Sequence, residues 1–198
     1  MRESLLTLLG YLWSAFGLYW LAAAARGKSG SAASEPQTGE PHFFRVMRLS
    51  VLGTTFALLF WRRLAIGFLG CRFVADFPAL DYAGFVATLA GFGIATWARI
   101  HLGRNWSDKV VIQAGHQLIR TGPYSRMRHP IYSGVLLGVF GTALVLGEWR
   151  GAVAFLLLLT NYAVKARKED RVLAESFGEE FDEHKRRAGF LLPKLRRA

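Results

Sequence analysis

The chain has 198 residues, of which 52% are hydrophobic and 14% aromatic, and its mean hydropathy is +0.23. A soluble domain is nearer about 45–50% apolar, so the composition favours a membrane protein. The formal charge of +11 could indicate nucleic-acid binding, but Lys and Arg stand mainly between long apolar runs, as the positive-inside rule describes. The single cysteine, Cys71, excludes an intramolecular disulfide and a cysteine-based metal site, and we expect no metal.

Apolar runs long enough to cross a membrane recur along the chain. A bilayer core about 30 Å thick requires about 20 apolar residues in a helix. Arg62 and Arg63 fall inside the second run, so we expect its apolar part to end near Trp61. The five predicted spans are Ser4–Ala25, Leu49–Leu69, Leu80–His101, Pro130–Leu146 and Trp149–Lys165.

The segments between the predicted spans differ in character. Residues 26–41 form a polar loop rich in Gly, Ser and Pro, whereas residues 102–129 form a basic connection. Only Gly147–Glu148 separates the last two spans, which predicts a tight helical hairpin. After them, 166–188 is highly charged with apolar residues at helical spacing, which predicts an amphipathic helix on the membrane surface or on the protein.

The predicted fold is therefore all-α and integral to the membrane, with about five transmembrane helices and a C-terminal amphipathic helix. We divide the chain into a two-span region, 1–79, and a region, 80–198, that holds the third span, the core with the polar clusters described below, and the tail. Most Lys and Arg lie in the connection 102–129 and in the tail, which places both in the cytoplasm and the amino terminus outside. Arg62, Arg63 and Arg72 argue mildly against this orientation, and the short loops suggest a bacterial inner membrane.

Polar residues gather at one end of the last three predicted spans. The connection contains two glycine-bearing turns, Leu102–Ser107 and Gly115–Tyr124, whose backbone groups can bind a ligand's polar edges if they are buried against protein. The alternative is a plain cytoplasmic loop. On these residues alone the two interpretations are equally favoured.

A second cluster, 126–134, opens the fourth predicted span. Pro130 suits the first position of a helix, and the backbone donors there suit an anionic group such as a carboxylate. His129 adds a switchable donor or acceptor, and Tyr132 adds an aromatic face. The alternative is a basic helix start with an interfacial tyrosine, which many spans have.

A third cluster, 161–170, lies where the fifth predicted span leaves the bilayer. Lys165 and Glu169 are four residues apart and share a helix face. A carboxylate there could face a cationic group of a ligand or accept hydrogen bonds from its hydroxyl or amino groups. The alternative is an exposed ion pair, worth at most about 1 kcal/mol.

The order of these motifs is more specific than any one of them. Arg-His-Pro-x-Tyr opens a short span, a tight hairpin follows, and an acidic pair precedes Phe177-Gly-Glu-Glu-Phe181 and Pro193. This order resembles the isoprenylcysteine carboxyl methyltransferase family, which shares its carboxy-terminal region with phospholipid N-methyltransferases. The resemblance covers about Ile100 to Pro193. It implies that S-adenosylmethionine is held between the last two spans, the preceding loop and the tail.

The resemblance also assigns roles to residues. Lys165 stands where the family usually has an arginine that engages the substrate carboxylate, so it is the implied catalytic residue. Lysine keeps the positive charge but loses the planar two-donor fork of arginine. Asp170 stands where a second glutamate is common. The implied cofactor-binding residues are His116, Gln117, Leu118, Ile119, Tyr124, His129, Pro130, Ile131, Tyr132 and Glu169.

These roles imply direct methyl transfer to a lipophilic or prenylated acceptor at the membrane interface. A carboxylate or thiolate needs no general base, and an apolar tail could enter sideways from the lipid. Lys165 would repel an amine acceptor, which disfavours phospholipid N-methylation. The alternatives are a methyltransferase of a phospholipid or small thiol, a steroid-reductase-type membrane enzyme that uses a nicotinamide cofactor, and a non-catalytic membrane scaffold.

Overall fold

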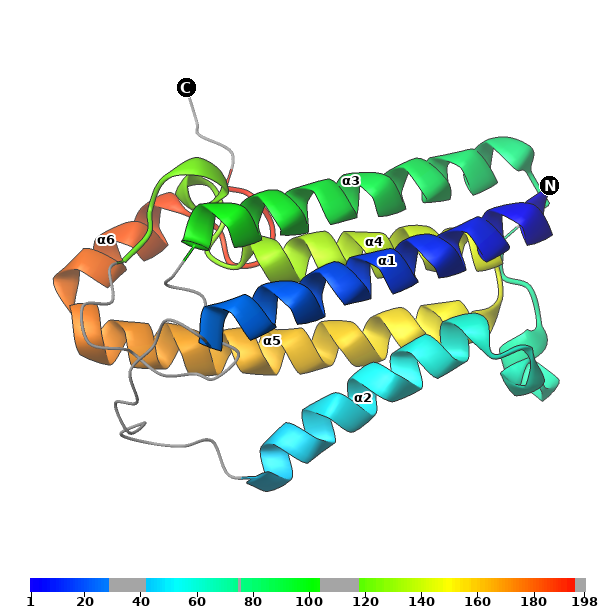
Figure 1. The fold of residues 1–198 in the computed structure, drawn as a ribbon, viewed down its shortest axis with the longest axis horizontal. Coiled ribbons are helices and arrows are strands. Elements are labelled where there is room, and N and C mark those ends of the chain that lie inside the picture. The colour runs from blue at the N-terminus through cyan, green and yellow to red at the C-terminus, as the bar shows by residue number, and fades with distance from the viewer. Residues whose placement is uncertain (29–41, 75, 104–117, 195–198) are drawn as a thin grey trace.

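The structure, a computed structural model, describes residues 1–28, 42–74, 76–103 and 118–194. Five long helices run alternately up and down, and a short sixth lies across one end (Figure 1). The six are α1 Arg2–Lys28, α2 His42–Phe60, α3 Pro78–Leu102, α4 Pro130–Leu146, α5 Trp149–Phe177 and α6 Glu179–Arg187. The N-terminus and α6 therefore lie at opposite ends of the bundle (Figure 1). The prediction of an all-α membrane fold is confirmed.

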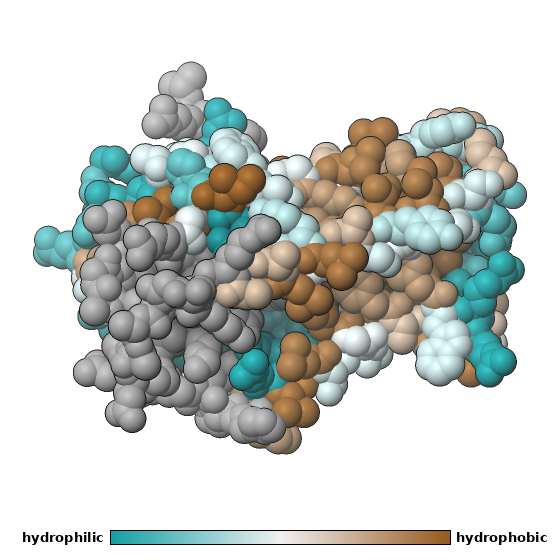
Figure 2. Space-filling view, in the orientation of Figure 1, coloured by the Kyte–Doolittle hydropathy of each residue, from teal (hydrophilic) through white to brown (hydrophobic). Residues whose placement is uncertain are grey.

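Three of these helices are long and apolar enough to cross a membrane. They are α1 over Arg2–Ala25, α2 over Phe43–Phe60 and α3 over Pro78–Leu102, whereas α4 is apolar but has only 17 residues. Apolar residues cover the middle of the face in Figure 2, and hydrophilic residues lie towards both ends. The predicted number of five spans stays a prediction.

The bounds of α3 and α4 agree with the apolar runs. The second predicted span, Leu49–Leu69, is wrong at its start, whereas the expected end of its apolar part near Trp61 is confirmed by the end of α2 at Phe60. Helix α2 starts at His42, because Phe43, Phe44, Val46 and Met47 continue the apolar run towards the amino terminus, and it ends at Phe60. Beyond Phe60 the chain forms two short 3₁₀ turns, Arg62–Leu64 and Gly67–Gly70. Arg150 of α5 donates to the carbonyls of Leu58 at 3.0 Å and Trp61 at 3.4 Å, which satisfies the end of α2.

The predicted hairpin between the last two spans is confirmed. Gly147 ends α4 with a φ of 68°, a left-handed conformation that glycine adopts without a steric cost. The charged segment 166–188 is not one helix, however. Helix α5 continues through Phe177 and stops at Gly178, where φ is 50°, and α6 follows. The turn at Gly178 folds α6 back towards the start of α4.

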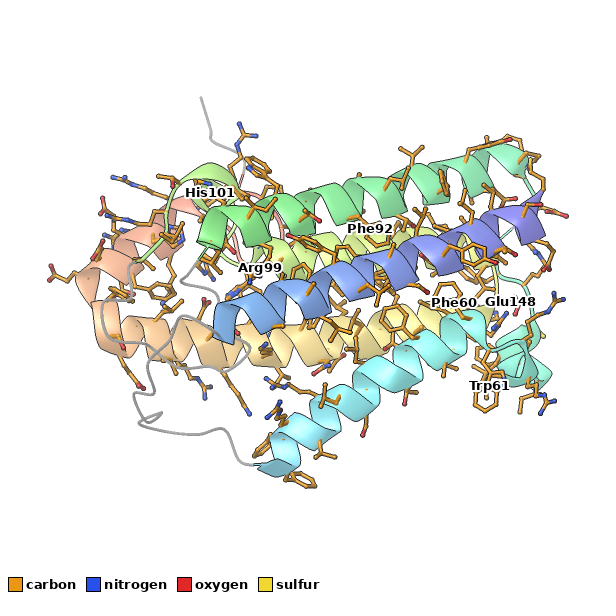
Figure 3. The ribbon with its side chains drawn as sticks, viewed as in Figure 1. Phe60, Trp61, Phe92, Arg99, His101 and Glu148 are labelled. Atoms are coloured by element: carbon orange, nitrogen blue, oxygen red, sulfur yellow. The ribbon has the colours of Figure 1, made fainter. Side chains whose placement is uncertain are left out.

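The helices pack closely to form the core, and this packing fixes the position of α4 in the bundle. Helix α3 packs along α4, α4 along α5, and α2 lies mainly against α5 (Figure 1). Between α1, α3 and α4, Trp13 donates to Thr142 at 3.0 Å, and the Thr88 hydroxyl lies 3.1 Å from the Gly138 carbonyl. Phe92, in the middle of α3, stacks on Phe16 (Figure 3). These buried contacts hold α4 against α1 and α3, which positions the polar residues at the start of α4.

Candidate functional site

The start of α4 and the second half of α5 meet at the end of the bundle that also carries α6. Tyr132, in the first turn of α4, donates its hydroxyl to the Glu169 carboxylate over 2.5 Å. The Lys165 ammonium lies 3.8 Å from the same oxygen. The predicted shared face of Lys165 and Glu169 is therefore present, and it faces α4.

His129 lies between two carboxylates. Its Nε2 is 2.9 Å from Asp170 and its Nδ1 is 3.4 Å from Glu169, and only 5% of its side chain is exposed. Arg128 holds the other side of Asp170, with nitrogens 3.0 and 3.2 Å from Oδ2. Glu169 contacts the side chains of His129, Tyr132 and Lys165. Arg128 and His129 hold the adjacent Asp170, which helps to fix this turn of α5.

The charges of this group follow from the contacts. Burial would lower the pKa of His129, but hydrogen bonds to Asp170 and Glu169 outweigh it and raise the pKa. Burial would raise the pKa values of Glu169 and Asp170, but the hydrogen bond of His129 and the nearby cations lower both. The two carboxylates therefore favour the protonated form of His129.

Tyr132 and His129, which contact Glu169, belong to a group of aromatic rings. The rings of Tyr132 and Tyr162 stack with centroids 4.7 Å apart, and His129 stacks on the other side of Tyr132 at 5.6 Å. The Lys165 ammonium lies 5.3 Å from the centre of the Tyr132 ring. A carboxylate next to an aromatic ring attracts a cation in two ways, because the carboxylate is negatively charged and the ring face has a negative quadrupole potential. The site can therefore hold a positively charged group.

The C-terminal segment closes one side of the site. The amide of Arg128 donates to the Gly189 carbonyl over 2.9 Å, and the Arg128 guanidinium donates to the Ala188 carbonyl over 2.9 Å. Ser133 donates to the carbonyl of Leu191, and the ring of Phe190 meets His129 edge-on at 5.4 Å. The segment after α6 thus covers the helix start that carries His129.

The other predicted site residues differ in burial, and two of them lie outside the described residues. Tyr124 is buried beside the His101 ring, and burial, followed by the charge of Glu169, raises its pKa. His101 and Arg99 lie at this same end of the bundle, far from Glu148 (Figure 3). Pro130 is buried and Leu118, Ile119 and Ile131 are half-buried, while His116 and Gln117 lie outside the described residues.

Some residues of the site were not predicted. Arg128 stands in the basic motif without any signal that it binds Asp170, and Tyr162 reads as one more apolar-span residue. Phe190 belongs to the tail, 61 positions from its neighbour His129, so no local spacing relates the two. Only the packing of α4, α5 and the tail brings these residues together.

Comparison with known proteins gives three relevant matches. The phospholipid methyltransferase family matches residues 80–180. A probable protein-S-isoprenylcysteine O-methyltransferase of Oryza sativa subsp. indica is 30% identical over 178 residues, covering 88% of this chain and 87% of the relative. The protein-S-isoprenylcysteine O-methyltransferase of Saccharomyces cerevisiae is 34% identical over 113 residues, covering 56% of this chain and 47% of that protein.

A solved structure shares the fold. It is the eukaryotic intramembrane Ras methyltransferase, isoprenylcysteine carboxyl methyltransferase, with a TM-score of 0.58 and 17% sequence identity. The match covers 86% of this chain but only 60% of that one. The bundle described above is therefore the helical core that the two proteins have in common.

Proposed function

Because this chain belongs to the isoprenylcysteine carboxyl methyltransferase family of integral-membrane methyltransferases, we propose that it transfers the methyl group of S-adenosylmethionine to a carboxylate on a lipophilic, isoprenylcysteine-like acceptor. One observation carries the proposal. Glu169 is a half-buried carboxylate that accepts from the Tyr132 hydroxyl and lies beside Lys165, a cation suited to an anionic acceptor. Opposite charges thus stand side by side, as a cationic donor and an anionic acceptor require.

The residues around Glu169 fit S-adenosylmethionine. Its sulfonium and amino groups are cationic, and the Lys165 ammonium already lies between Glu169 and the Tyr132 ring as a cation would. When bound, the cofactor supplies an activated methyl group on a positively charged sulfur. Glu169, Tyr132 and the neighbouring Tyr162 would hold it, and Tyr124, Leu118 and Ile119 would extend the same site.

The chain's own residues bind and orient rather than transfer protons. Arg128, His129 and Asp170 fix Glu169, so we regard them as positioning residues. Lys165 would orient the acceptor carboxylate. A carboxylate is already a nucleophile at neutral pH, so no general base is needed. Alignment of the reactants and exclusion of water can lower a barrier by several kcal/mol, up to about 7–11 for ideal alignment.

The product identifies the acceptor chemistry. Purified protein in phosphatidylcholine nanodiscs would be supplied with methyl-labelled S-adenosylmethionine and N-acetyl-S-farnesylcysteine. We expect the label in a product from which mild alkali releases methanol, because only an ester is cleaved this way. Label that survives alkali would indicate a thioether or an N-methyl amine, and no incorporation by folded protein would contradict the proposed reaction.

Replacing Lys165 by glutamine is expected to lower kcat/KM for the carboxylate acceptor by about ten- to hundredfold, because a charge-assisted hydrogen bond is worth about 1.5–3 kcal/mol. Arg167→Gln removes a charge from an exposed position of the same helix and should leave the rate unchanged. With an amine acceptor Lys165 would be repulsive, so a faster rate in Lys165→Gln would contradict a carboxylate acceptor.

We also propose that the site-bearing end faces the cytoplasm of a bacterial cell, because Lys and Arg gather there. Cys71 is exposed, and its carbonyl accepts a hydrogen bond from Trp149 at the opposite end of the bundle. Since it is the chain's single cysteine, it reports orientation directly. A membrane-impermeant maleimide should label Cys71 from outside intact spheroplasts. Labelling only after lysis would show that the protein has the opposite orientation.

A further inference from the structure

A cavity of about 220 Å³ lies between α2 and α5, beside the candidate site. Its wall is mainly apolar and includes Met47 and Val51 from α2 and Leu157 and Val164 from α5. A water molecule accounts for about 30 Å³ of liquid, so the cavity has room for part of an aliphatic chain. Both helices expose apolar residues towards the surrounding lipid, from which such a chain could enter.

Three cations stand on the wall of this cavity: Arg48 from α2, and Lys165 and Lys168 from α5. Among the described residues that line it, none is acidic. An apolar space with only positive charges on its wall is complementary to an amphiphile that has an anionic head. The cavity is therefore complementary to the anionic acceptor itself.

The cavity joins the candidate site through Lys165, which lines it and also lies 3.8 Å from Glu169. Asn161 of α5 donates to the backbone carbonyl of Arg48 over 3.4 Å, which holds this turn of α2 against α5. Lys168 differs, because its ammonium lies 4.0 Å from the centre of the Phe44 ring. Arg48 is thus the cation of α2 that shares the site with Lys165.

We propose that Arg48 is a second acceptor-binding residue, which holds the anionic group together with Lys165 while the cavity between α2 and α5 holds the apolar chain. The inference rests on the proposed methyl transfer and adds a residue from outside the region matched by the methyltransferase family. Lys165 alone presents a point charge. A guanidinium has the planar pair of donors that a carboxylate binds best, so Arg48 provides the geometry that Lys165 lacks.

The same arrangement favours product release. Methylation turns the carboxylate into a neutral ester, which no longer attracts Arg48 and Lys165 but keeps the apolar chain. The acid should therefore bind more tightly than its ester, and the difference measures the contribution of the cations alone. A site that recognised only the chain would bind the two equally.

The acid–ester pair gives the test. Wild-type protein and variants in phosphatidylcholine nanodiscs would be titrated with N-acetyl-S-farnesylcysteine and with its methyl ester, and separately with S-adenosylmethionine. The test variant is Arg48→Gln. Arg45→Gln is the matched control, because Arg45 is an exposed cation one turn away on α2 that does not line the cavity. Arg48→Lys tests whether charge alone is sufficient.

We expect wild-type protein and Arg45→Gln to prefer the acid by about tenfold or more, and Arg48→Gln to lose most of that preference while it binds S-adenosylmethionine normally. Arg48→Lys should keep part of it. Equal binding of acid and ester by the wild type, or an unchanged preference in Arg48→Gln, would overturn the role of Arg48. Failure of the proposed function is distinct, because wild-type protein would then fail to bind S-adenosylmethionine or to form the ester.

Discussion

Replacing Glu169 by glutamine is expected to weaken S-adenosylmethionine binding by about ten- to hundredfold, because a hydrogen bond to a charged group is worth about 1.5–3 kcal/mol. Glutamine keeps the shape and can still accept from Tyr132, but it removes the negative charge that would face the cationic cofactor. It also removes one of the two carboxylates that flank His129. The dissociation constant would be measured by calorimetry on protein in detergent.

Glu175→Gln is the matched control for this prediction. Glu175 is an exposed carboxylate further along α5, so its replacement removes the same charge without touching the site. Both variants should show the circular dichroism of the wild type. Equal affinity of Glu169→Gln and wild type for the cofactor would show that Glu169 does not bind it.

Replacing Gly91 by alanine is expected to destabilise the bundle by about 1–3 kcal/mol or more, as overpacking does in a well-packed core. The added Cβ would lie 2.5 Å from the backbone nitrogen of Gly138 and 3.0 Å from its Cα, so α3 and α4 would have to separate. Separation would also stretch the contact between Thr88 and the Gly138 carbonyl. Small residues at such positions let transmembrane helices approach closely.

Gly93→Ala controls for the change of residue type, because a Cβ at Gly93 meets nothing within 4 Å. Alanine is the better helix former by about 1 kcal/mol, so this variant should be as stable as the wild type or more stable. Thermal unfolding in one detergent would compare the three proteins. Equal midpoints for Gly91→Ala and Gly93→Ala would contradict the close packing of α3 on α4.

Sequence rules for the starts and ends of helices predicted the bounds of the helices better than they predicted which helices pack together. Helix α4 begins at Pro130 and is capped by Gly147, as the apolar run predicts, because proline is favoured at the start of a helix and glycine just after its end. Helix α2 starts earlier than predicted because apolar residues continue the run across Arg45 and Arg48 as far as Phe43. That α2 packs mainly on α5 depends on side-chain complementarity between distant segments, which no single stretch of sequence encodes.

The candidate site divides in the same way. The pair of Lys165 and Glu169 follows from helix geometry, and so could be predicted from spacing. The placement of His129 between Glu169 and Asp170 depends on how α4 meets α5, and the contact of Phe190 depends on the tail. Arg48 comes from a helix outside the recognisable motifs. The binding roles of all these residues stay predictions until a ligand is measured.

The most direct measurement is a calorimetric titration of the wild-type protein with S-adenosylmethionine, beside a titration with a reduced nicotinamide dinucleotide. We expect saturable binding of S-adenosylmethionine at one site per chain and no binding of the nicotinamide cofactor. Folded protein that does not bind S-adenosylmethionine, even when N-acetyl-S-farnesylcysteine is present, would contradict the assignment of this site to methyl transfer.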